Sequence, residues 1–102
     1  MKVHERFLNY VNFDTQSVPD VEVIPSSEKQ KSLAAYLVEE MKQIGIRDAY
    51  MDQHCYVYGT VIKNTDKQVP VIGFIAHMDT SPDMPGNDIK PKIIHNYDGF
   101  LF

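Results

Sequence analysis

The residues best suited to chemistry are His77 and Asp79, which lie two positions apart in residues 73–79 (GFIAHMD). In extended backbone, side chains at this spacing point to the same side. A neutral histidine can bind zinc through one ring nitrogen while a carboxylate holds the other N–H and so fixes the tautomer. Taken alone, the pair is more typical of a hydrogen-bonded surface contact, so a metal role for His77, oriented by Asp79, is a hypothesis that needs support from its surroundings.

A complete metal site cannot be assembled from this sequence with the residues at hand. A catalytic zinc usually takes three protein ligands and keeps one position for water or substrate. Solvated helix, turn or terminal positions explain the remaining candidates, which are His4, His54, His95, Asp83 and Asp88. His77 is therefore predicted to be one ligand of an incomplete set.

The sequence lacks the motifs that nucleotide-binding proteins, serine esterases and thiol-redox proteins require. The sequence has no Gly-rich phosphate loop, no G-x-S-x-G elbow and no Cys-x-x-Cys pair. The formal net charge of -4, without a basic run, argues against a nucleic-acid or anionic-membrane partner. No stretch fits a secretory signal or a bilayer span, and Cys55 is the only cysteine, so the expected compartment is the cytoplasm.

Two helices are expected to precede the strand that carries His77. Apolar residues at helical spacing predict a first helix over residues 3–13. A capping box formed by Ser27 and Gln30 begins a second apolar stripe, which predicts a helix over residues 27–44. The intervening residues 14–25 are rich in turn formers and are expected to form an ordered loop.

The expected fold class is α/β, with the two helices packed on a mixed β-sheet in a single domain of 102 residues. Residues 56–62 and 69–76 are predicted to pair as a hairpin, and 49–51 and 93–94 are weaker strand candidates. The nearly continuous apolar run 69–76 is typical of a central strand covered on both faces. Its carboxyl end would place His77 where ligands bind in open α/β sheets.

Two separated stretches of the chain resemble the peptidase T family. They are residues 6–11 (RFLNYV) with 14–17 (DTQS), and residues 74–83 (FIAHMDTSPD). Between them, residues 25–28 (PSSE) and 52–57 (DQHCYV) are similar as well. The resemblance therefore covers nearly the whole chain, in the family's order, but only the beginning of the family's protein.

The resemblance implies a cytoplasmic hydrolase that removes the amino-terminal residue from tripeptides, using two zinc ions. It also implies a phosphorylase/hydrolase-like α/β/α catalytic domain, of which residues 1–102 would be the amino-terminal part, and a smaller lid domain. In that family the histidine matching His77 binds zinc, and the aspartate matching Asp79 belongs to the catalytic site as the residue that orients this ligand. The bridging carboxylate, the glutamate base and the other ligands come later in the family's sequence, so the chain alone is expected to be inactive towards its small peptide substrate.

Two alternatives to this function stay open. A related zinc dipeptidase or deacylase would share the His-x-Asp pair, and a non-catalytic interaction module could keep the fold without the activity. The end also departs from the family, which usually continues with a second glycine after Gly99, whereas this chain ends in residues 100–102 (FLF). These apolar residues pack on the sheet, or they mark an artificial end or an altered reading frame; the oligomeric state is left open.

Overall fold

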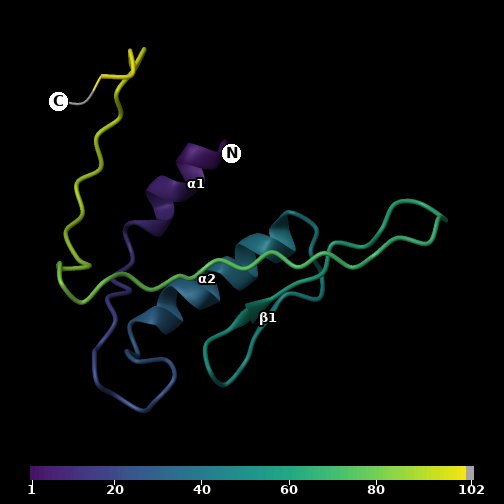
Figure 1. Ribbon diagram of the computed structural model, residues 1–102, viewed down its shortest axis with the longest axis horizontal. Coiled ribbons are helices and arrows are strands. Elements are labelled where there is room, and N and C mark those ends of the chain that lie inside the picture. Colours follow the sequence, from purple (N-terminus) through teal and green to yellow (C-terminus); the bar gives the residue numbers. More distant parts are fainter. Residues whose placement is uncertain (101–102) are drawn as a thin grey trace.

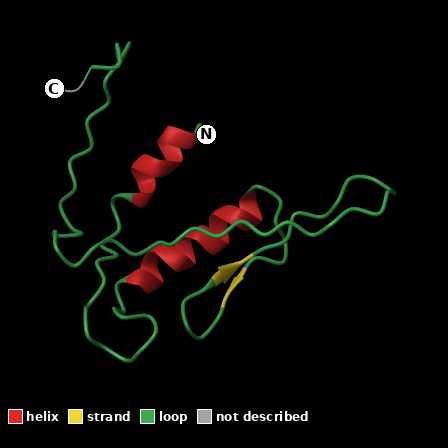
Figure 2. Ribbon diagram, in the orientation of Figure 1, coloured by secondary structure: helices red, strands yellow, loops and turns green. Residues whose placement is uncertain are grey.

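The computed structural model describes residues 1–100 (Figure 1). It contains two helices, α1 (Val3–Tyr10) and α2 (Gln30–Gln43), and two short strands, β1 (Tyr50–Met51) and β2 (Val57–Tyr58). The strands pair antiparallel, with Tyr50 opposite Tyr58. Figure 2 shows that loops and turns connect these elements and form the rest of the chain. The last two residues of the apolar end, Leu101 and Phe102, lie outside the described part.

Helix α1 is held against α2 by aromatic and polar contacts. The ring of Tyr36 on α2 lies 6.1 Å from the ring of Tyr10 and 5.2 Å from that of Phe13. The buried carboxylate of Glu40 lies 2.7 Å from Nη1 of Arg6 and also accepts a hydrogen bond from the Tyr10 hydroxyl. Each polar group at this junction therefore has a partner, as burial requires.

Both predicted helices are present, and both are shorter than predicted at their ends. After α1, the N–H groups of Asn12 and Phe13 donate to carbonyls three residues back, and the Asn12 side chain donates to the carbonyl of Leu8 at 3.1 Å. These contacts close the helix with a tightened turn. The predicted capping box at α2 is wrong, because the Gln30 amide donates to the hydroxyl of Ser26 at 3.2 Å instead of reaching the backbone of Ser27.

The core lies between α2 and the β1–β2 hairpin. Its buried apolar residues are Leu33, Ala34, Val38, Ala49 and Cys55. Asp52 organises the hairpin turn, since its Oδ1 accepts from the N–H groups of His54 and Tyr56, each at 2.9 Å. Just after β2 the chain passes so close to α2 that a Cβ at Gly59 would overlap the side chains of Met41 and Ile46.

The predicted mixed sheet, with residues 69–76 as its central strand, is wrong. Within the described chain these residues form no strand, and they run as an open stretch that crosses α2 in the view of Figure 1. Val71, Phe74 and Ile75 are 99%, 95% and 100% exposed. A strand that is apolar on both faces needs cover on both faces and strands beside it, and residues 1–100 supply neither.

The predicted strand partner of residues 56–62 is corrected as well. Val57–Tyr58 pairs with the preceding segment Tyr50–Met51, which was the weaker candidate, and not with residues 69–76. The short connection through the Asp52 turn costs less loop entropy than a longer one would. Stacking of the Tyr50 and Tyr58 rings, with centroids 5.2 Å apart, adds a cross-strand contact. The segment at 93–94 forms no strand in the described part.

Candidate metal-ligand site

The structure brings His77 and Asp79 into contact. Nδ1 of His77 lies 2.9 Å from the backbone carbonyl oxygen of Asp79 and 3.0 Å from its carboxylate Oδ1. A carbonyl oxygen can only accept, so Nδ1 must carry the hydrogen in this arrangement. In the neutral ring, Nε2 is then unprotonated and has a lone pair to offer.

The pair is open to solvent at the end of the apolar run. The His77 side chain is 85% exposed and that of Asp79 is 44% exposed. A metal ion or another ligand can therefore reach the imidazole without any displacement of core residues. This geometry suits one zinc ligand with its orienting carboxylate, the arrangement that often surrounds zinc-bound histidine.

The ring also borders a groove of about 900 Å³. Its lining includes Leu33, Leu37 and Met41 from the apolar stripe of α2, together with residues 74–79. Phe74 and Ile75, which line the groove, are almost fully exposed, so this part of its lining is uncovered apolar chain. We therefore attribute the groove to the open position of residues 69–76 and not to a shaped ligand pocket.

No three His, Cys, Asp or Glu side chains come together as a metal site within residues 1–100. His54 and Cys55 border the same groove as His77, but the His54 ring packs beside Tyr56, with centroids 6.2 Å apart. Because a catalytic zinc usually needs three protein ligands, the described residues fit one ligand and do not fit a whole zinc site.

The other candidates occupy the turn and surface positions that were expected of them. Asp83 accepts a hydrogen bond from the hydroxyl of Ser81 at 3.1 Å, within its own turn. Asp88 has a φ of 52° and its carboxylate lies 3.4 Å from the Lys90 ammonium. Neither aspartate approaches His77 closely enough to form a cluster with it.

An anchor that no sequence pattern predicts fixes the chain immediately after Asp79. The N–H of Thr80 donates to the carbonyl of Thr15 at 3.2 Å. The carbonyl of Thr80 accepts from both the N–H and the hydroxyl of Ser17, each at 2.9 Å. Residues 14–17 had been expected to form part of a loop, and no periodic pattern links them to residue 80. Their place in the family-like stretch DTQS was the only available signal.

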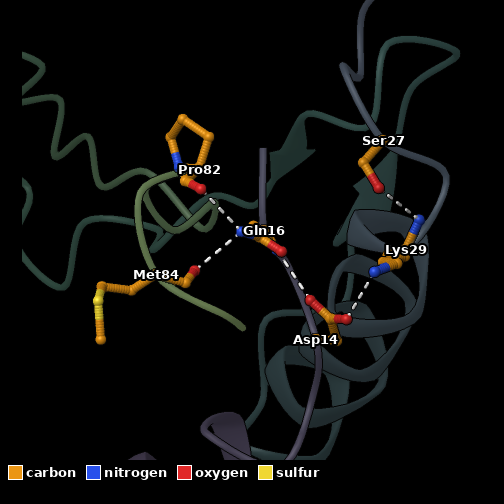
Figure 3. A network of polar contacts seen from close by, with 6 residues as sticks. All are labelled: Asp14, Gln16, Ser27, Lys29, Pro82 and Met84. Carbon is orange, nitrogen blue, oxygen red and sulfur yellow. Dashed lines mark hydrogen bonds and ion pairs between the residues drawn. The ribbon is translucent and has the colours of Figure 1, made fainter. Parts of the chain in front are cut away.

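The side chain of Gln16 extends this anchor to the following turn (Figure 3). Its amide nitrogen donates to the carbonyl oxygens of Pro82 at 3.0 Å and Met84 at 2.9 Å. A Cβ at Gly86 would lie only 3.0 Å from Cβ of Gln16. The loop on the carboxyl-terminal side of His77 and Asp79 is thus closely packed on Gln16.

Asp14 connects the anchor to the start of α2. Its Oδ2 lies 2.7 Å from Nζ of Lys29, and its Oδ1 accepts from the N–H of Gln16 at 3.2 Å. The hydrogen bond from Lys29, and secondly that from Gln16, hold the pKa of the Asp14 carboxyl below its usual range. The charged form of Asp14 is therefore the one that the anchor favours.

No helix within residues 1–100 is both long and apolar enough to cross a membrane. No family model matches the chain. Its relatives in sequence include proteins named peptidase T from three bacteria. The one from Alkaliphilus oremlandii is 56% identical over 97 residues, which cover 93% of this chain and 24% of that protein. The one from Bacillus pumilus is 54% identical over 95 residues, or 93% of this chain and 23% of the relative.

The relative from Halothermothrix orenii is 49% identical over 98 residues, which are 96% of this chain and 24% of that protein. The chain thus spans about a quarter of the length of the relatives it matches. The similarity runs through the anchor, the hairpin and the His77–Asp79 pair alike, since it covers nearly all of the chain. Over nearly all of its own length, the chain is therefore similar in sequence to about a quarter of peptidase T.

Proposed function

We propose that the chain contributes His77 as one zinc ligand, through Nε2, to a peptidase T type aminopeptidase site. Asp79 is the residue that orients this ligand. The observation that supports the proposal is the contact of Nδ1 with the backbone carbonyl oxygen and the carboxylate Oδ1 of Asp79, which leaves Nε2 as the nitrogen with a lone pair. A carboxylate on the far nitrogen fixes the ring and strengthens it as a ligand.

The activity in this proposal is release of the amino-terminal residue from tripeptides in the cytoplasm, with a pair of zinc ions. Residues 1–102 would correspond to the amino-terminal part of an α/β/α catalytic domain, with the lid domain formed by other residues. Bound zinc would supply a Lewis acid to that site. Residues 1–100 hold no group of three candidate ligands, so we expect the chain on its own to bind zinc weakly and to cleave no peptide.

Zinc titration of the 102-residue chain by calorimetry tests the ligand assignment. We expect weak binding that is lost in His77→Ala and retained in the matched variant His95→Ala, since both changes remove one exposed imidazole. Asp79→Asn is expected to weaken binding by about 10- to 100-fold, because it removes the charge that steadies the ring.

Two results would contradict the proposal. If His77→Ala bound zinc as well as the unaltered chain, His77 would not be the ligand. If the purified chain cleaved tripeptides at an appreciable rate, residues beyond these would not be required for the activity.

Two other functions remain as alternatives. A related zinc dipeptidase or deacylase would use the same His77–Asp79 contact, and assays of the complete reading frame on dipeptides, tripeptides and acylated amino acids distinguish these activities. A non-catalytic interaction module is favoured by the nearly full exposure of Val71 and Ile75. Self-association of the chain, together with a lack of zinc binding by His77, would support the module.

A further inference from the structure

The His77–Asp79 pair has no backbone support on its amino-terminal side. Within the described residues, the backbone of residues 69–78 takes part in no hydrogen bond. The apolar side chains before the pair are exposed, so core packing does not fix this stretch either. The geometry of the pair must therefore be set by residues on its carboxyl-terminal side.

Support on that side of the pair comes from residues 15–17. Thr80 is bound at both its N–H and its carbonyl, by Thr15 and Ser17. One turn later, the Gln16 amide donates to two carbonyls, those of Pro82 and Met84. A primary amide has two hydrogens to donate, so both donors of this side chain are used in holding the turn. Figure 3 shows the amide of Gln16 between the two carbonyls.

We propose that Gln16 is a positioning residue for the His77–Asp79 pair. By binding the carbonyls of Pro82 and Met84, it keeps the turn after Thr80 against residues 15–17. Asp79 is thereby held in the orientation in which its backbone carbonyl oxygen and its Oδ1 accept from Nδ1 of His77. This inference rests on the proposed function for the meaning of the pair, and it extends that function to a residue more than sixty positions away in the sequence.

The tautomer of His77 provides a readout that a purely structural role of Gln16 would not change. Nitrogen chemical shifts of the imidazole in the labelled 102-residue chain report which ring nitrogen carries the hydrogen. We expect the Nδ1–H form to predominate in the unaltered chain. In Gln16→Glu, which keeps the shape of the side chain but has no N–H to donate, this form should lose its predominance. Zinc affinity should fall by about tenfold, as for loss of an outer hydrogen bond.

Gln68→Glu is the matched control, because it makes the same change of charge at an exposed position outside the anchor. It should leave the His77 signals unchanged, and the His4 and His54 signals should be unchanged in both variants. If Gln16→Glu fails to fold, the His77 tautomer is measured in Gln16→Met instead. The methionine side chain has a similar length but carries no charge and no amide.

The outcomes separate this inference from the proposed function. An unchanged His77 tautomer in a folded Gln16 variant overturns the positioning role, even if zinc binding depends on His77. If the tautomer is altered in that variant but zinc affinity is unchanged by His77→Ala, the positioning role is supported and the proposed function is overturned. If the Nδ1–H form of His77 does not predominate in the unaltered chain, both the positioning role and the proposed function are overturned.

Discussion

Among single residues, the buried carboxylate of Glu40 shows how polar groups join the two helices. It is satisfied by Arg6 from one side and by Tyr10 from the other. Burial, and secondly the hydrogen bond to Glu40, raise the pKa of Tyr10 from 10.0 to about 12. The neutral phenol is thus favoured in the folded chain, and its contribution to stability is complete below pH 10 and is lost as the pH rises towards 12.

We expect Tyr10→Phe to lower the free energy of unfolding near neutral pH by about 1–2 kcal/mol, because it removes a hydrogen bond to a buried charge. The difference between the variant and the unaltered chain should shrink as the pH rises from 10 to 12, since the phenolate loses the bond as well. Urea unfolding at several pH values measures both effects. Tyr56→Phe, at a half-exposed ring, is the control. A difference that stays constant up to pH 12 would argue against this account of Tyr10.

The contact of His77 with Asp79 was predictable from sequence, whereas the Glu40 and Gln16 contacts were not. In extended backbone, side chains two positions apart point to the same side, so the spacing of His77 and Asp79 already suggests a contact. Glu40 and Gln16 meet partners 30 or more positions away, so their contacts depend on how the elements pack. The roles of His77 and Asp79 in binding zinc remain a prediction.

Among the elements, the two helices and the two observed strands lie within predicted segments, whereas the pairing of the strands and the strand predicted at 69–76 were wrong. The apolar stripe of α2 is complete within the helix, so its sequence suffices to place it. A strand also depends on its neighbours and on cover for its faces. Residues 57–58 pair with the segment that a short turn brings beside them, and residues 69–76 stay unpaired in the described part. In place of the predicted mixed sheet, the described residues therefore form only a two-stranded hairpin.

The passage of Gly59 beside α2 gives a test of how the hairpin packs. A Cβ there would overlap the ends of Met41 and Ile46; the flexible Met41 can yield, but the branched Ile46 yields less easily. We expect Gly59→Ala to destabilise the chain by about 1–2 kcal/mol relative to Gly73→Ala. A Cβ at Gly73 meets nothing within 4 Å, so that variant controls for the gain that alanine brings in the unfolded chain. Equal urea midpoints for the two variants would show that the hairpin does not pack on α2 in this way.

As a whole, the molecule is less compact than its length suggests. Its radius of gyration is 16.7 Å, whereas a compact domain of this size has about 13 Å. Its small core leaves Val71, Phe74 and Ile75 almost fully exposed. An exposed apolar stretch with unpaired backbone groups is a template for pairing with another chain.

We expect the 102-residue chain to associate with itself as its concentration rises, through the stretch that contains Ile75. Ile75→Lys should shift sedimentation towards the monomer while changing the free energy of unfolding by less than about 0.5 kcal/mol. Val61→Lys places the same charge at a position that is 83% exposed and lies outside this stretch, and it should leave association unchanged. A chain that stays monomeric at all concentrations, with or without these changes, would rule out this interface.

The anchor formed by Gln16 also has a consequence for the order of folding. Its two hydrogen bonds join positions that are 66 and 68 residues apart, whereas both helices and the hairpin form from near neighbours. Contacts between distant positions close a long loop and so form late. During synthesis the anchor can form only after Met84 has left the ribosome, so the imidazole and carboxylate at positions 77 and 79 would reach their final places later than the groups of both helices and the hairpin.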